Sequence, residues 1–208
     1  MTDRELVPTM SAFLEAKAER AGMLEGYRFL DEKRLILAGE IMTNMRDYAL
    51  AHARWREAEA AAREALRAAV GRHGLDELGL YPPGRIDCGL ATRSRIVLGV
   101  RIEEPLPERP TDDEQQQDAP PPANQSPEAD ACRAAFAALL PIAARLAVLT
   151  GNLERLRVEY LRTSRRARAL EDVLLPEMDA RIDVIDNALE ELEREEAVRV
   201  RWRGVVAS

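Results

Sequence analysis

Apolar residues recur every three or four positions between residues 8 and 70, which is the spacing of one face of an α-helix. Pro8 suits a helix start, and Thr9 or Ser11 can cap the first turn. No proline interrupts the stretch after Pro8, and glycines follow it at positions 71, 74 and 79. The pattern predicts one helix over residues 8–70, about 90 Å long at 1.5 Å per residue. Its apolar seam consists of Phe13, Ala16, Met23, Tyr27, Leu30, Leu37, Ile41, Tyr48, Ala51, Trp55, Ala58, Ala62, Ala65 and Ala69.

Two polar residues, Arg34 and Asn44, fall within this seam. A buried asparagine in a coiled coil fixes register and partner choice at some cost in stability. The alternative is that both side chains reach the edge of the seam and keep their polar ends in water. The sequence leaves both interpretations open.

A second helical pattern occupies residues 126–203. Ser126 is a favourable N-cap, Pro127 fits the first helical position, and Glu128 places an acid in the first turn. Pro141 is expected to disturb the helix only mildly near its start.

The seam of the second helix changes register near Pro176. Apolar residues alternate at intervals of three and four up to Leu174, then continue in two steps of four through Met178 to Ile182. Such a stutter locally unwinds a left-handed coiled coil, and Pro176 removes one helical hydrogen bond, so we expect a bend. The predicted seam contains Leu146, Leu149, Leu153, Leu156, Tyr160, Thr163, Ala167, Leu170, Leu174, Met178, Ile182, Ile185, Leu189 and Leu192.

Residues 71–102 lie between the two helical patterns, and we expect them to form a small head. Residues 95–102 are rich in β-branched side chains, and residues 85–90 form a short run before them. The pattern predicts a β-hairpin that turns at residues 91–94. Residues 103–125 contain six prolines, three consecutive glutamines and many acids. That composition predicts a flexible insert.

Two long helices with one apolar seam each bury their seams most simply against each other. The expected fold is therefore dominated by α-helices: a long antiparallel two-helix coiled coil with a small central head that contains a short β-hairpin. Because the second helix is the longer one, part of its seam should pack against the head or a partner.

Composition agrees with this fold. Aromatic residues make up 4% of the chain and charged residues 32%, which is typical of long helices and coiled coils. The net charge of −7 disfavours nucleic acid as the main partner.

We find neither a signal peptide nor an apolar stretch of about 18 residues, so we expect no direct membrane insertion. Cys88 and Cys132 lie in dissimilar contexts, which favours a reduced, cytosolic protein.

No group of residues predicts catalysis, a cofactor or a bound metal. His52 and His73 are the only histidines, and they lie in separate contexts. The glycines that follow residue 70 lack the Lys-Ser/Thr pair of a phosphate-binding loop. The acidic run at residues 190–196 is typical of a solvated helix face. We therefore expect a non-catalytic protein without cofactors.

An arginine cluster occurs within residues 155–168, although the chain is acidic overall. Glu159 is the one acid in this stretch. A solvated helix face and contact with an acidic partner surface explain the cluster about equally well. The cluster consists of Arg155, Arg157, Arg162, Arg165, Arg166 and Arg168.

Three stretches resemble the family of D subunits of V/A-type rotary ATPases. Residues 163–182 contain a basic run, then Ala-Leu-Glu, aliphatic residues, a proline and a continuing helix. Residues 189–200 are similar to the C-terminal run of that family. Residues 8–37, with Gly-Tyr-Arg-Phe-Leu from Gly26, are similar to its opening helix. Together they place the resemblance over about residues 10–60 and 140–203.

Two features depart from the family pattern. Ala167-Arg168 stands where the family usually has Val-Asn, and the insert at 103–125 looks peculiar to this chain. Both concern the details of contacts made by the head.

The resemblance implies a central-stalk rotor shaft that carries no active site. It would couple ATP hydrolysis or synthesis in a catalytic ring to ion translocation. The implied partners are the A and B subunits of the ring, the small F subunit of the central stalk and the socket above the membrane ring. The implied location is cytoplasmic and peripheral to the plasma membrane. Curvature near Pro176 would let a rotating shaft push unequally on the ring.

The resemblance also suggests which residues bind partners. Contacts with the catalytic ring are expected from Met10, Phe13, Lys17, Arg20, Val198, Arg199 and Arg201. Independently of the resemblance, the charge pattern suggests contacts of the head or with an acidic partner surface, which are expected from the arginine cluster together with Ile96 and Leu98.

Two rival interpretations remain beside the rotor. One is a free-standing coiled-coil adaptor, and the other is a nucleic-acid binder that uses the arginine cluster. The direction of ATP chemistry and the choice between H⁺ and Na⁺ would depend on other subunits.

Overall fold

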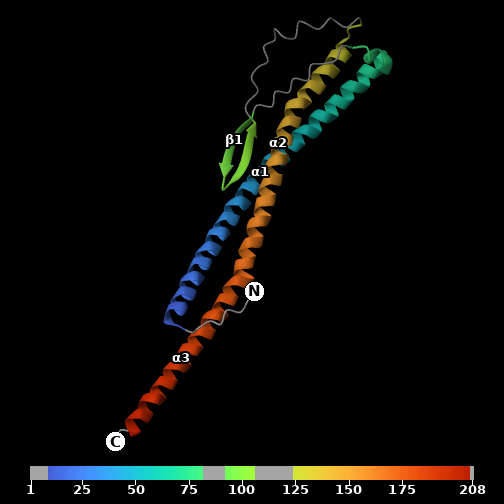
Figure 1. Ribbon diagram of the computed structural model, residues 1–208. Coiled ribbons are helices and arrows are strands. Elements are labelled where there is room, and N and C mark those ends of the chain that lie inside the picture. Colours follow the sequence, from blue (N-terminus) through green and yellow to red (C-terminus); the bar gives the residue numbers. More distant parts are fainter. Residues whose placement is uncertain (1–8, 82–91, 106–123, 207–208) are drawn as a thin grey trace. The chain divides into compact units, whose positions relative to one another are not determined.

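The computed structural model describes residues 9–81, 92–105 and 124–206. It is dominated by helices and contains one antiparallel two-stranded sheet (Figure 1). The elements are α1 (Met10–Leu78), β1 (Thr92–Val97), β2 (Val100–Pro105), α2 (Pro127–Ala169), the π-helix η2 (Leu170–Leu174) and α3 (Leu175–Val206). This confirms the predicted fold class of two long helical segments with a small β-hairpin.

The chain divides into two compact units, which are described separately. Unit 1 combines residues 1–36 with residues 160–208, and unit 2 contains residues 37–159. The division passes through α1 and α2, so each unit contains a part of both.

The apolar seam predicted for α1 is confirmed. Every one of its residues is buried or half-buried, and Leu37, Ala62 and Ala69 are completely buried. Asn44 is also buried, but its amide donates to the Glu40 carbonyl of the same helix at 2.9 Å. Arg34 is half-buried and pairs with Asp31 one turn earlier at 2.5 Å. Both polar side chains therefore bond within α1.

The ends of α1 follow from capping and glycine geometry. Thr9 Oγ1 accepts the backbone N–H of Ala12 at 3.2 Å, which makes Thr9 the N-cap. The helix does not end at residue 70 as predicted, because Gly71 stays helical at a cost of only about 1 kcal/mol relative to alanine. The break comes at Gly74, whose φ of 72° and ψ of 168° are not helical, and one further turn reaches Leu78.

In unit 1, α1 and α3 pack against each other in antiparallel directions. Their core contains Ala16, Met178, Ile182 and Ile185, with Phe13, Met23 and Leu189 partly buried against it. Across this core Glu19 pairs with Arg181 at 3.5 Å, and the next residue of α1, Arg20, pairs with Asp179.

The register change predicted near Pro176 coincides with η2. The Leu175 N–H donates to the Leu170 carbonyl, a bond that spans five residues rather than the four of an α-helix. A widened turn just before Pro176 relieves the clash that a proline ring makes with an α-helical carbonyl. Leu174 and Leu192 depart from the predicted seam, because they are 39% and 48% exposed. Leu175 is half-buried instead.

In unit 2, the β-hairpin forms in a different register from the predicted one. Val97 pairs with Val100, so the turn is Leu98-Gly99 and not residues 91–94. Both turn residues have positive φ, 47° and 87°, as a two-residue type I′ turn requires. The predicted first strand at 85–90 lies outside the described residues, and β2 continues to Pro105, into the predicted insert.

The hairpin is fastened to both helices of unit 2. Val100 and Ile102 of β2 are buried. Arg95 pairs with Glu40 of α1 at 2.9 Å. On α2, the amide of Asn152 accepts the Glu103 N–H at 2.9 Å and donates to the Glu103 carbonyl at 2.7 Å. Asn152 is 2% exposed, so these bonds replace the hydrogen bonds that its amide group would otherwise make with water.

The start of α2 follows the predicted capping. Ser126 Oγ accepts the backbone N–H of Ala129 at 3.2 Å, and Pro127 is the first helical residue. Arg72 pairs with Glu128 at 3.1 Å and His73 contacts Ser126, which joins this end of α2 to the end of α1. Pro141 lies inside α2 without ending it.

Replacing Asn152 by alanine should loosen the hairpin. The N–H and C=O of Glu103 would both lose their partner, and we expect the free energy of unfolding to fall by about 2 kcal/mol. Urea unfolding and hydrogen exchange of the Glu103 amide measure this. Thr150→Ala is the control, because Thr150 is exposed and bonds only to Leu146 of its own helix. Equal stability of the two variants would contradict the assigned role.

Acid should weaken the pair of helices in unit 1 through Asp179. The hydrogen bond and charge of Arg20 lower the Asp179 pKa from its ordinary value of 3.8. The pair therefore contributes above that value, and its contribution disappears as pH falls through the lowered pKa. Both side chains are more than 40% exposed, so the effect should be small and weakened by salt. The measurement is Tm against pH, which should depend less on acid in Asp179→Asn than in the control Asp183→Asn.

Candidate partner-binding surfaces

The four predicted ring-binding residues of α1 have different surroundings in unit 1. Met10 is 57% exposed, and Lys17 is exposed with its ammonium 4.1 Å from the centre of the Phe13 ring. Phe13 packs on the core, and Arg20 is held by Asp179 through two contacts. Met10 and Lys17 are thus available at the surface, whereas Phe13 and Arg20 also maintain the helix pair. Their contact with a ring remains a prediction.

The last part of α3 has no packing partner among the described residues. Leu189 is the last half-buried residue, and all residues from 190 to 203 are exposed. Val198 is 58% exposed, Val200 68% and Trp202 73%. Val198 and Trp202 stand four residues apart and so share one face of this unpacked part of the helix, which makes that face a candidate partner surface. We call residues 190–203 the α3 tail.

The residues that are expected to contact the catalytic ring do not all lie at the same height along unit 1. Phe13 lies with Leu189 at the edge of the core, whereas Val198 lies about 13 Å further along α3 at 1.5 Å per residue. Arg199 and Arg201 are exposed on the same tail. Trp202 was missed as a candidate. Its signal was present, because it stands four residues after Val198 and shares a helix face with it.

The arginine cluster divides into engaged and unengaged side chains. Arg155 donates to Asn152 at 2.8 Å, and Arg157 pairs with Glu154 at 3.1 Å. The other four are exposed and form no ion pair with the described residues. They are Arg162, Arg165, Arg166 and Arg168, all on the part of α2 in unit 1. These four form an exposed basic surface on α2, and its contact with an acidic partner stays a prediction.

The two predicted hairpin contacts differ in exposure. Ile96 is 76% exposed on β1. Leu98 is half-buried at the turn, where its positive φ is unfavourable for a leucine.

A Ser-His-Glu arrangement joins the ends of α1 and α2 in unit 2. His73 Nε2 lies 2.5 Å from Ser126 Oγ, and His73 Nδ1 lies 3.3 Å from Glu77. The hydroxyl of Ser126 already accepts the Ala129 N–H, and Ser126 is 3% exposed. A nucleophile must reach its substrate. This serine is instead a helix cap that the histidine holds.

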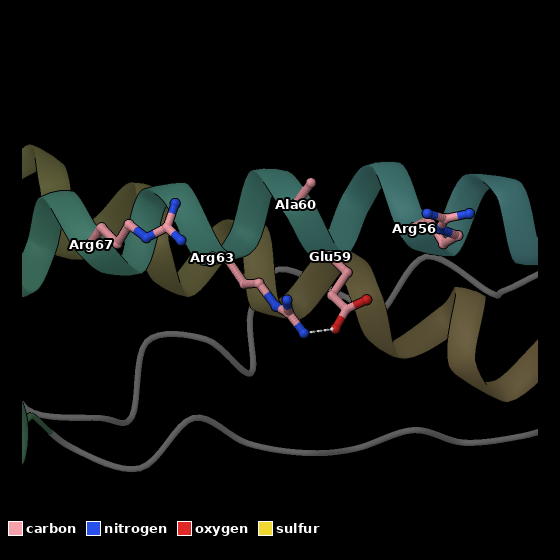
Figure 2. Close-up of a pocket in the computed structure, with 5 residues that line it drawn as sticks. All are labelled: Arg56, Glu59, Ala60, Arg63 and Arg67. Atoms are coloured by element: carbon pink, nitrogen blue, oxygen red, sulfur yellow. Dashed lines mark hydrogen bonds and ion pairs between the residues drawn. The ribbon is translucent and has the colours of Figure 1, made fainter.

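A shallow depression lies on one face of α1. Figure 2 shows its lining, which is Arg56, Glu59, Ala60, Arg63 and Arg67. Glu59 and Arg63 form an ion pair at 2.6 Å. Its volume is about 340 Å³, and every lining residue comes from a single helix. Because no second element among the described residues lines it, the depression offers no described walls to surround a small molecule.

Two observations bear on metals and thiols. Within residues 9–81, 92–105 and 124–206, no cluster of three or more His, Cys, Asp or Glu could hold a metal ion. Cys132 is a free thiol whose pKa is raised by burial, which keeps it protonated and poorly reactive. Cys88 lies outside the described residues.

One expectation about hydrophobicity was wrong. The helix over Pro127–Arg203 contains a stretch with a mean hydropathy of 1.8, which is long and apolar enough to cross a membrane by length and composition. Only 17% of that stretch is buried. From Ala134 to Gly151 the only charged residue is Arg145, and seven residues are alanine. The stretch contains no long run of large apolar side chains, and one such helix is weak evidence of a membrane span.

Comparison with known proteins identifies relatives along nearly the whole chain. The family model for the D subunit of ATP synthase matches residues 12–203. The V-type ATP synthase D subunit of Anaeromyxobacter dehalogenans is 33% identical over 197 residues, covering 93% of this chain and 92% of the relative. The A-type ATP synthase D subunit of Pyrococcus furiosus is 33% identical over 204 residues, covering 93% and 91%.

The matched region includes α1 from Ala12 onward, the hairpin and the π-helical register change, as well as the α3 tail up to Arg203. A match at this identity over this share of both chains shows common family membership. The chain belongs to the family of ATP synthase D subunits.

Proposed function

We propose that this chain is the central rotor shaft of a V/A-type ATPase and carries no active site itself. It would couple ATP hydrolysis or synthesis in a catalytic ring to ion movement across the plasma membrane. Support comes from the family and from the names of the relatives, which are D subunits of V-type and A-type ATP synthases. The observation that carries the proposal is the α3 tail, a helix with exposed Val198, Val200 and Trp202.

The partners follow from the same proposal. The α3 tail and Met10 would contact the A and B subunits of the ring. The four unengaged arginines of α2 and the hairpin would contact the small F subunit of the central stalk, and the end of unit 2 that contains the head would meet the socket above the membrane ring. The chain would lie on the cytoplasmic side, held to the membrane by the complex.

The antiparallel pairing in unit 1 suits the transmission of torque. Its core interlocks side chains from α1 and α3, and Arg20–Asp179 and Glu19–Arg181 bridge them from the sides. Twisting one helix against the other would break these contacts together, because packed interiors resist small displacements. The widened turn at η2 gives the second helical segment a place to curve.

Co-assembly tests the proposal directly. The purified chain is mixed with the ring and the F subunit from the same source, and mass is measured by light scattering alongside ATP hydrolysis. One copy per hexamer with altered hydrolysis is expected.

Replacing Val198 and Trp202 by serine should weaken assembly at least about tenfold, because buried aromatic anchors dominate interfaces.

Val184→Ser is the matched control, since Val184 is 64% exposed on α3 but lies beside the paired core. A chain that stays separate from a folded ring would overturn the rotor and favour the free-standing adaptor. Equal assembly of the tail variant and the control would remove the tail from the interface.

Pro176→Ala should lower the coupling of hydrolysis to ion transport in the assembled complex. Alanine supplies the N–H that proline lacks, so an ordinary α-turn becomes favourable where η2 now lies. Coupling is measured as ions moved per ATP in reconstituted vesicles. Pro141→Ala is the control, because Pro141 also lies inside a helix but outside unit 1. Unchanged coupling in Pro176→Ala would show that this curvature is not used.

A further inference from the structure

The two outer edges of the β-hairpin differ in their hydrogen bonding. The outer edge of β2 is closed at Glu103, where Asn152 bonds both the backbone N–H and the backbone C=O. A side-chain amide in this position does what a neighbouring strand would do. No described residue makes the corresponding bonds to the outer edge of β1. Within the part of the chain that the structure describes, the edge of β2 is therefore bonded at Glu103, whereas the edge of β1 is open.

The register of the hairpin shows which groups are open. Val97 and Val100 close the two-residue turn as a hydrogen-bonded pair, so the pairs alternate from there along the strands. Ile96, Ser94 and Thr92 are then the residues whose N–H and C=O groups point away from β2.

The bonds of Asn152 check this assignment independently. Glu103 pairs with Ser94, and its N–H and C=O must point outward to reach Asn152. By the symmetry of an antiparallel pair, the groups of Ser94 point outward on the opposite edge.

The side chains of β1 indicate what kind of strand fits beside it. Ile96 is 76% exposed on one face of the strand. On the other face Arg95 is neutralised by Glu40 and Glu104, whereas Arg93 forms no ion pair with the described residues. A strand beside β1 would therefore place apolar residues next to Ile96 and acidic residues next to Arg93.

We propose that the open edge of β1 binds an extended segment of a partner protein as a third, antiparallel strand with alternating apolar and acidic residues. Unpaired edge groups form a ready template for such an addition. The apolar residues of the partner lie opposite Thr92, Ser94 and Ile96 and exchange backbone hydrogen bonds with them. One of its acids lies opposite Arg93, and the residues between its apolar positions make no backbone bonds to β1. The site lies on the hairpin that the proposed function assigns to the F subunit, and the peptide experiment tests it without that subunit.

The experiment uses the full chain and a capped, fluorescent octapeptide in which valine and glutamate alternate. Saturable binding is measured by fluorescence anisotropy. Methylation of the valine backbone nitrogens should weaken binding at least about tenfold, since it removes the donors that face β1. The same methylation on the glutamates should leave binding unchanged, because their N–H groups face solvent. Equal effects of the two methylated peptides, or no saturable binding, would overturn the proposal.

A variant of the protein gives the reciprocal test. Ser94→Pro removes an outward N–H, and proline is compatible with an edge strand at such a position. It should weaken binding about tenfold, whereas Ser94→Val should bind as the wild type does.

Hydrogen exchange adds a readout on the unaltered chain. The amides of Ser94 and Ile96 should exchange fast alone and become protected with the peptide, while those of Arg93 and Arg95 are protected in both states. Protection that does not change at Ser94 and Ile96 would overturn the proposal.

Discussion

Both units depend on burying a narrow apolar seam between helices that have little else to bury. In unit 1 this seam is made of a few large side chains, such as Met178, Ile182 and Ile185, against the small Ala16. Each contributes by leaving water, and the ion pairs beside them add orientation more than energy, because they are exposed. The direction and register of the helices are thus set by where apolar residues stand in the sequence.

The same rule explains which parts of the fold could be predicted. The α1 seam is a long periodic pattern, and every residue assigned to it is buried or half-buried. The hairpin register was missed because Leu98 occupies a turn position that usually carries Asn, Asp or Gly. The two hydrogen bonds between Asn152 and Glu103 join residues that are distant in the sequence, and no local sequence pattern indicates them. Capping at Ser126 was predictable because its signal is local.

Candidate surfaces were predictable only in part. Val198 and the arginine cluster stood out by type, but the sequence could not separate Arg155, bonded to Asn152, from Arg162, which is exposed without an ion pair to the described residues. Whether an arginine is bonded depends on which residues the fold brings next to it. Family membership adds what geometry cannot, because a helix with exposed apolar residues indicates a partner without identifying it.

The seam of α1 in unit 2 differs from that in unit 1 in one respect that affects its response to heat. From Ala51 to Ala69 its members are alanines, apart from Trp55, so most turns remove little apolar surface from water. The heat-capacity change on unfolding scales with the apolar surface that becomes exposed. This part of the helix therefore contributes little curvature to the stability curve, and its share of the folding free energy varies only gently between cold and warm conditions.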